Sequence, residues 1–144
     1  MIRLIQISTI FALLTFSAYA EVTVHNAWVR PTVPQQKVTG AFMTITSTTP
    51  AQLVGITSPV AERVEIHKMK MDNDVMTMRA VSSLPLPAGK QIKLAPGGYH
   101  VMLFDLHQQV QAGDNVPLTL IIEDRTKKRT FVTIKAIATS VVGN

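Results

Sequence analysis

The sequence of 144 residues contains no cysteine. This absence excludes disulfide bonds, thiolate zinc sites, cysteine nucleophiles, iron–sulfur ligation and lipid attachment through a cysteine of this sequence. It also excludes a blue-copper electron-transfer site, because such a site needs a cysteine thiolate on the metal. Methionine is the sulfur-containing residue of this chain, with seven in all and four of them between residues 69 and 78.

Charged residues are also few, at 16% of the chain, whereas apolar residues make up 47%. A chain of this length and composition can bury one core, so we expect a single folded domain. The net charge of +5 comes from scattered basic residues with one short run at residues 127–129. Because a nucleic-acid interface needs a basic stripe or patch, we expect no nucleic-acid partner.

The first 20 residues have the pattern of a secretory signal peptide. Arg3 precedes an uneven apolar stretch, and the small-x-small sequence Ala18-Tyr19-Ala20 follows it, as at signal-peptidase sites. A membrane anchor is the alternative, but the stretch is shorter than the ~20 apolar residues of a spanning helix. We therefore expect cleavage after Ala20 and a mature domain of residues 21–144 that does not span a membrane.

The rest of the chain alternates runs rich in Val, Ile and Thr with clusters of Pro, Gly, Asn and Asp. Short runs at such spacing are typical of an all-β sandwich or barrel. No window longer than about ten residues shows the 3.6-residue period of an amphipathic helix. The predicted strands lie at residues 22–28, 41–46, 52–56, 63–71, 75–81, 89–94, 99–106, 118–123 and 129–136. The sequence thus predicts one antiparallel β-sandwich of about eight or nine strands.

Histidine and methionine share one face of the strand predicted at residues 63–71. Since side chains alternate along a strand, Glu65, His67, Met69 and Met71 lie on the same side, which its charged members mark as solvent-facing. A turn at residues 72–74 would form a hairpin that brings the methionines of the next strand opposite them. Methionine is usually a core filler, but core packing poorly explains methionines on a polar face beside a histidine.

A second pair, His100 and Met102, shares one face of a later strand. Two imidazoles and two or more thioethers form a soft ligand set, which suits Cu(I) and suits Mg²⁺, Ca²⁺ or Mn²⁺ badly. The two remaining histidines, His25 and His107, lie in polar surroundings, and we expect both at the surface.

The spacing of these residues resembles the motif of the periplasmic copper(I) chaperones of the PCu(A)C type. That motif is a His, ten residues, a Met, twenty-one residues and then His-x-Met. The four candidate ligands that match it are His67, Met78, His100 and Met102. Further similarity lies at residues 27–31, 40–45, 86–89, 94–103 and 112–120, so that the resemblance covers roughly residues 27–134.

The resemblance implies a cupredoxin-like Greek-key sandwich with an exposed site for one Cu(I) per chain. It also implies a periplasmic chaperone that delivers copper to an acceptor such as the Cu(A) subunit of cytochrome c oxidase. Other copper chaperones are further candidate partners, and we expect a monomer. Met69, Met71 and Met76 fall outside the motif and are interpreted as a supporting shell or a transfer path.

Two other classes of function are weighed against this one. A hydrolytic enzyme would need paired carboxylates, or a nucleophile with a base and an orienting partner. The residues near His67 and His100 in the sequence do not include such a set. We therefore expect no enzymatic activity. The second alternative is an extracytoplasmic β-domain whose methionine-rich surface binds a partner protein. Within the copper hypothesis, copper tolerance or storage without delivery to an oxidase remains open.

Overall fold

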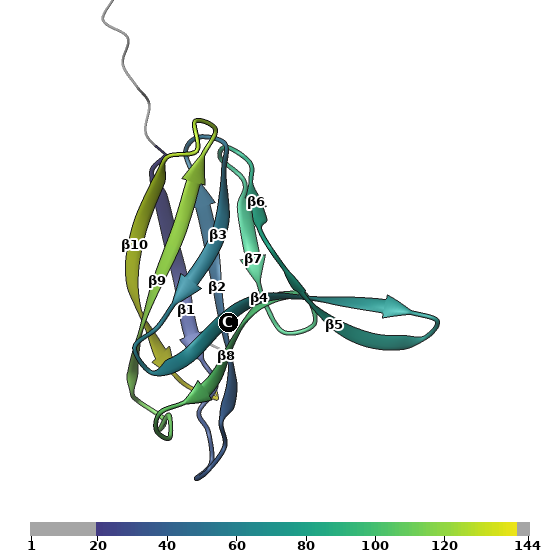
Figure 1. The fold of residues 1–144 in the computed structure, drawn as a ribbon, viewed down its shortest axis with the longest axis vertical. Coiled ribbons are helices and arrows are strands. Elements are labelled where there is room, and N and C mark those ends of the chain that lie inside the picture. Colours follow the sequence, from purple (N-terminus) through teal and green to yellow (C-terminus); the bar gives the residue numbers. More distant parts are fainter. Residues whose placement is uncertain (1–19, 141–144) are drawn as a thin grey trace, which may run out of the picture.

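The structure, a computed structural model, describes residues 20–140, so the predicted signal peptide lies outside the described residues apart from Ala20. This part of the chain is all β (Figure 1). Its strands are β1 (Val22–Val29), β2 (Val38–Ser47), β3 (Ala51–Thr57), β4 (Ala61–Asp72), β5 (Val75–Val81), β6 (Leu84–Leu86), β7 (Gln91–Leu94), β8 (Tyr99–Leu106), β9 (Asn115–Asp124) and β10 (Arg129–Ala138). All nine predicted strands are present with somewhat different ends. The tenth, β6, escaped prediction because it is three residues long and has Pro85 at its centre, where proline removes a ladder hydrogen bond.

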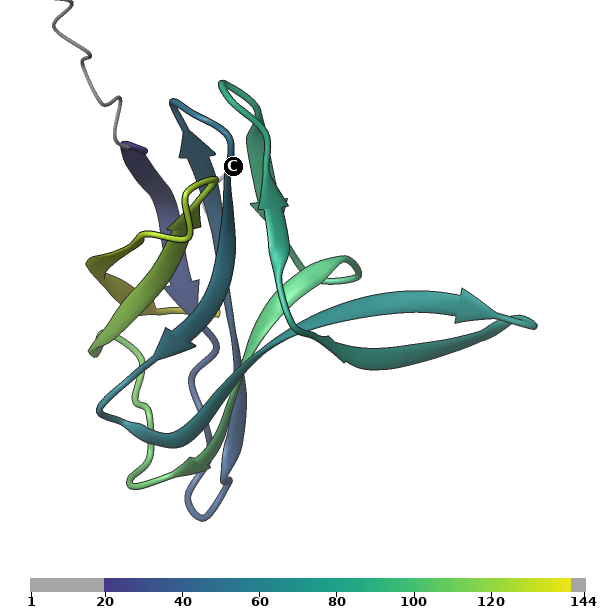
Figure 2. The same ribbon diagram turned by 45° about the horizontal axis from the view of Figure 1, so that its top comes forward.

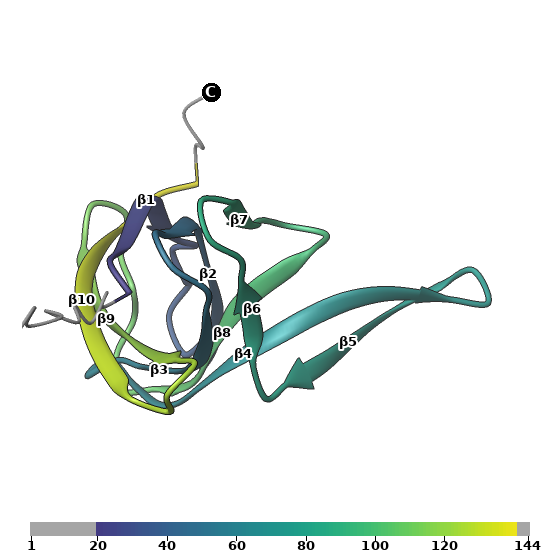
Figure 3. The ribbon, with the colours of Figure 1, turned by 90° about the horizontal axis from the view of Figure 1, so that it is seen from above.

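The strands form one continuous sheet that folds over on itself (Figure 3). Their order is β5-β4-β8-β2-β1-β10-β9-β3-β6, and β7 pairs with the second half of β2. All neighbours are antiparallel except β1 and β10, which pair in parallel through Trp28 with Ile137 and Val29 with Ala138. In this order most neighbouring strands are not consecutive in the sequence. Strand β8, for example, lies between β4 and β2.

The folded sheet encloses one hydrophobic core, which makes residues 20–140 a single domain. In β9 every second residue is buried, namely Val116, Leu118, Leu120 and Ile122, as the two-residue period of a strand requires. Strand β2 is buried on both faces over most of its length. Within residues 20–140, no helix has the length and hydrophobicity needed to cross a membrane.

The hairpin of β4 and β5 projects away from the enclosed core (Figures 1 and 2). Strand β4 pairs with β8 only as far as Lys68, and beyond this point its partner is β5 alone. Asn73 and Asp74 form the turn with positive φ angles of 47° and 63°, the combination of a type I′ turn. Asn and Asp tolerate this left-handed conformation better than other non-glycine residues. The turn predicted at residues 72–74 is thus confirmed by the observed backbone angles.

Candidate metal centre

The register of β4, β5 and β8 places the four candidate ligands on one face of the sheet. His67 lies directly opposite His100, and Met102 is opposite Glu65 in the same strand pair. Met78 in β5 is opposite Met69. Directly paired residues point to the same face, and residues two apart along a strand share that face. Met102 and Met78 therefore lie on either side of the histidine pair.

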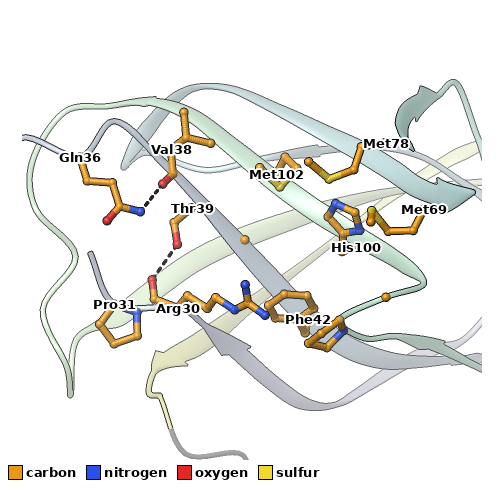
Figure 4. Close-up of a pocket in the computed structure, with 13 residues that line it drawn as sticks. Arg30, Pro31, Gln36, Val38, Thr39, Phe42, Met69, Met78, His100 and Met102 are labelled. Atoms are coloured by element: carbon orange, nitrogen blue, oxygen red, sulfur yellow. Dashed lines mark hydrogen bonds between the residues drawn. The ribbon is translucent and has the colours of Figure 1, made fainter. Parts of the chain in front are cut away.

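Three of the candidate ligands, Met78, His100 and Met102, line a pocket of about 360 Å³ (Figure 4). Figure 4 shows the side chains of Met102, Met78 and Met69 arranged around the His100 imidazole. His67 is not among the lining residues, although its ring centroid lies 5.8 Å from that of His100. Met69, which the sequence motif leaves out, thus reaches the pocket, whereas His67 lies beside it.

A backbone carbonyl orients the imidazole of His100. The side chain is almost fully buried, and its Nδ1 lies 3.0 Å from the carbonyl oxygen of Gly98. Since a carbonyl oxygen only accepts hydrogen bonds, Nδ1 carries the proton and Nε2 keeps a free lone pair. The same carbonyl accepts a hydrogen bond from the backbone N–H of Met69 at 3.2 Å. A ring held in this way presents a fixed donor nitrogen to a metal ion.

A carboxylate holds the imidazole of His67 through Nε2, whereas His100 is held through Nδ1. Nε2 of His67 lies 2.7 Å from a carboxylate oxygen of Glu65, which also forms an ion pair with Arg63. The hydrogen bond from His67, with the neighbouring Arg63 guanidinium, lowers the pKa of Glu65 below its usual value, so this carboxyl group is ionised at neutral pH. The neutral ring therefore carries its proton on Nε2 and keeps its lone pair on Nδ1.

Nδ1 of His67 is buried and has no hydrogen-bond partner among the described residues. Buried polar atoms without a partner are rare in folded proteins and call for an explanation. The ring packs against Phe104 at a centroid distance of 5.8 Å, and the guanidinium of Arg63 covers the Phe104 ring at 4.2 Å. The orphaned lone pair has the chemistry of a metal ligand on a ring that is held by its surroundings.

Aromatic residues form the wall of the pocket beside His100. The ring centroid of Phe42 lies 6.4 Å from that of His100, and Trp28 stacks on Phe42 at 4.4 Å. The guanidinium of Arg30 lies 5.1 Å from the Phe42 centroid and also borders the pocket. Phe42 was not among the site residues predicted from the sequence. Its place opposite Trp28 in β1, and the pairing of its strand with β8, are visible only in the structure.

The two histidines predicted at the surface, and also Lys68, lie outside the pocket. Lys68 lies on the face opposite His67, where its ammonium group is 5.2 Å from the Tyr99 centroid. His25 and His107 are exposed and lie outside the site. Over residues 20–140, His, Cys, Asp and Glu side chains form no group of three or more that could hold a metal ion. Any metal at this site would therefore depend on thioethers as well as imidazoles.

Comparison with known proteins identifies the family of this chain. Residues 22–134 match the family model described as "Putative lipoprotein LpqE-like". The chain belongs to the LpqE-like family. One relative of this chain is the protein named "Putative lipoprotein Lxx21020" from Leifsonia xyli subsp. xyli. The two are 34% identical over 117 residues, which cover 79% of this chain and 69% of the relative.

Solved structures similar to this LpqE-like protein include copper-bound ones. The solution structure of Cu(I)-DR1885 from Deinococcus radiodurans is 30% identical, with a TM-score of 0.59, and covers 80% of this chain and 75% of that one. The copper-bound PCuAC domain from PmoF2 is 24% identical, with a TM-score of 0.65, and covers 81% and 91%. The likeness to the PCuAC domain confirms the cupredoxin-like fold expected from the sequence.

Proposed function

We propose that this protein is an extracytoplasmic copper carrier that binds one Cu(I) with His67, Met78, His100 and Met102 and passes it to a copper-accepting protein. The observation that carries the proposal is the pairing of His67 with His100 on one sheet face, with the pocket methionines beside them. Each imidazole is held through one ring nitrogen, which leaves the other nitrogen free to bind a metal.

The chemistry of the donors favours a soft, monovalent ion. Thioethers are neutral and do not titrate, and together with imidazole they suit Cu(I) better than a hard cation. Zinc prefers His, Cys and carboxylate ligands, and this chain has no cysteine. The buried lone pair on Nδ1 of His67 would gain a partner when the metal binds. Because His67 lies beside the pocket, metal binding by its Nδ1 would require its ring to turn toward His100.

The relatives support both the cargo and the compartment. A similar structure is titled as the Cu(I) form of DR1885, and another as a copper-bound PCuAC domain. The family description and one relative's name both include the word lipoprotein, which supports a location outside the cytoplasm, and we propose the periplasm. The acceptor we propose is the Cu(A) domain of cytochrome c oxidase, with copper tolerance or storage as the alternative task.

A titration under anaerobic conditions tests the copper proposal. The protein should bind one Cu(I) tightly in competition with a chromophoric chelator, and it should bind Zn(II) much more weakly. The complex should be colourless, because Cu(I) has a filled d shell and no thiolate is available for charge transfer. An intense blue band, or zinc affinity equal to that for copper, would contradict the proposal.

Transfer to an acceptor separates delivery from storage. Mixing the Cu(I)-loaded protein with an apo Cu(A) domain should move copper faster than the same concentration of free chelated Cu(I) does. A chelator whose Cu(I) affinity equals that of the apo Cu(A) domain is the control. If this chelator removes copper from the carrier but the Cu(A) domain does not, storage or tolerance is the better assignment. A protein that binds no Cu(I) at all would leave only the alternative of a partner-binding surface.

A further inference from the structure

The projecting hairpin carries a set of methionines that the proposed site uses only in part. We call this set the methionine ladder; its members are Met69, Met71, Met76 and Met78. Met69 and Met78 form one cross-strand pair of β4 and β5, and Met71 and Met76 form the next pair toward the turn. All four therefore lie on one face of the hairpin.

The spacing of the ladder suits a small ion. Side chains directly opposite in an antiparallel pair have Cβ atoms about 4.5–5.5 Å apart, and successive pairs on one face lie about 7 Å apart along the strands. Methionine is unbranched and has three rotatable bonds, so sulfurs from neighbouring pairs can converge on a single ion. The two pairs thus form consecutive groups of donor sulfurs that a soft ion can reach one after the other.

Core packing does not account for the ladder. Met71 is 60% exposed, Met76 46% and Met78 52%, although each has a large apolar side chain. The opposite face of the hairpin holds the polar residues Lys70 and Thr77, which form the cross-strand pair between the two methionine pairs. A hairpin whose only task is to remain soluble would more commonly carry polar residues on both faces. The exposed thioethers therefore call for a ligand.

We propose that the methionine ladder is a second, weaker station for Cu(I), which connects the pocket to the exposed turn of the hairpin. This inference rests on the proposed function, because Met78 belongs to both stations. In each step one bond from copper to an imidazole nitrogen or thioether sulfur breaks as a bond to the next sulfur forms. Copper stays Cu(I) throughout, the departing ligand keeps its lone pair, and no proton or electron is exchanged.

The two stations should differ in strength because their ligands differ. The pocket offers imidazole nitrogens on partly or fully buried rings, whereas Met71 and Met76 offer neutral thioethers in contact with water. Cu(I) should therefore fill the pocket first and the ladder second. An ion held loosely near the turn is open to ligands of an acceptor from several directions, which favours rapid transfer.

Methionine ε-methyl NMR during an anaerobic Cu(I) titration distinguishes the two stations. The first equivalent should shift the Met78 and Met102 methyl signals, and the second should shift those of Met71 and Met76. Met43 is an internal control, because it is buried in the core at 2% exposure and should not respond to either equivalent. Met71 and Met76 signals that stay in place through the second equivalent would overturn the proposal.

The Met71→Leu, Met76→Leu double variant tests the role of the sulfurs. Leucine keeps the apolar volume, so a purely hydrophobic docking role would survive the change. We expect the variant to lose the second equivalent, to keep the affinity for the first, and to release copper to an acceptor several-fold more slowly. Retention of both equivalents and of the wild-type transfer rate would overturn the ladder while the proposed function stands.

The His100→Ala variant separates the two proposals further. It should lose the tight equivalent yet still show Cu(I)-dependent shifts at Met71 and Met76. No shift at Met71 and Met76 in this variant would overturn the ladder while the proposed function stands. Wild-type shifts at Met71 and Met76 with the first equivalent and none at Met102 would instead overturn the pocket assignment and the proposed order of the two stations.

Discussion

His67 and His100 are cross-strand partners whose imidazole centroids lie 5.8 Å apart, yet they are held by opposite ring nitrogens. Nδ1 of His100 donates to a backbone carbonyl, whereas Nε2 of His67 donates to the carboxylate of Glu65. The pair consequently offers Nε2 from one ring and Nδ1 from the other. This asymmetry gives the two histidines separate spectroscopic signatures and separate supporting residues.

The first prediction concerns the thioethers of the pocket. Met78→Leu and Met102→Leu should each lower Cu(I) affinity at least tenfold, because leucine fills the same volume without a donor atom. Such swaps usually cost less than ~1.5 kcal/mol even in a packed core, so folding should persist. Met43→Leu is the matched control, since Met43 is buried away from the pocket and should keep wild-type copper affinity. Competition with a Cu(I) chelator measures the Cu(I) affinity of all three variants.

The second prediction concerns Glu65 as a positioning residue for His67. Glu65→Ala should free the ring and lower Cu(I) affinity by about 10–100-fold, the usual effect of removing a residue that orients a metal ligand. Glu65→Gln should recover part of the affinity, because its amide oxygen can still accept from Nε2–H. The imidazole ¹⁵N spectrum of the apo protein should show His67 protonated at Nε2 and His100 at Nδ1.

Glu62 provides the control for that experiment. It lies in the same strand but is exposed and on the opposite face, so Glu62→Gln should change neither copper affinity nor the His67 spectrum. Equal losses in the Glu62 and Glu65 variants would show that overall charge, and not orientation of the ring, sets the affinity.

The third prediction concerns the β9–β10 turn and pH. One oxygen of Asp124 accepts hydrogen bonds from the Thr126 hydroxyl at 2.7 Å, from the Thr126 N–H at 2.8 Å and from the Lys128 N–H at 3.0 Å. These bonds, the hydroxyl bond foremost, lower the pKa of Asp124 below its usual value. The carboxylate thus stabilises the fold above the pKa of the unfolded chain, and this contribution is lost as pH falls through the folded-state pKa.

Thermal unfolding at several pH values measures this effect. Asp124→Asn should lower Tm at pH 7, and the difference from wild type should shrink as the pH approaches about 2. Thr126→Val, which removes the hydroxyl donor, should show a smaller difference with the same sign. A gap between wild type and Asp124→Asn that stays constant down to low pH would contradict the assignment.

The fourth prediction concerns the turn of the projecting hairpin. Asp74 has a φ of 63°, a conformation that glycine adopts without a steric cost, so Asp74→Gly should stabilise the hairpin by up to about 1 kcal/mol. Because β4 and β5 extend beyond the core, local opening is the sensitive quantity. Hydrogen exchange of the amides in Val75–Val81 should slow in the variant, while amides of β9 should exchange as in wild type.

The local parts of this structure could be predicted because they depend on short-range periodicity. The two-residue period of β4 predicted that Glu65, His67 and Met69 share a face, and Asp72, Asn73 and Asp74 predicted the turn. The pairing of β4 with β8 joins segments that are far apart in the chain, and no local pattern predicts that register. The resemblance to a family motif predicts four ligands, but the opposition of His67 to His100 came only from the structure.

Other features of the site could not be predicted because they depend on side-chain packing. The bond of Glu65 to His67, the position of Met69 in the pocket wall and the stacking of Trp28 on Phe42 all require coordinates. Met69 lies outside the sequence motif, and His67 lies inside it. In the structure Met69 lines the pocket and His67 lies beside it.

The parallel pairing of β1 with β10 has a consequence for the order of folding. The last strand of the described chain lies between β1 and β9, in the interior of the sheet order and not at its edge. A nascent chain that lacks β10 leaves β1 and β9 with unsatisfied edges, so the sheet cannot close before β10 has been synthesised. Domains dominated by such distant pairings fold in milliseconds to seconds. His67 and His100 lie on strands of this same sheet, so we expect a newly made chain to have no stable pocket until β10 has docked.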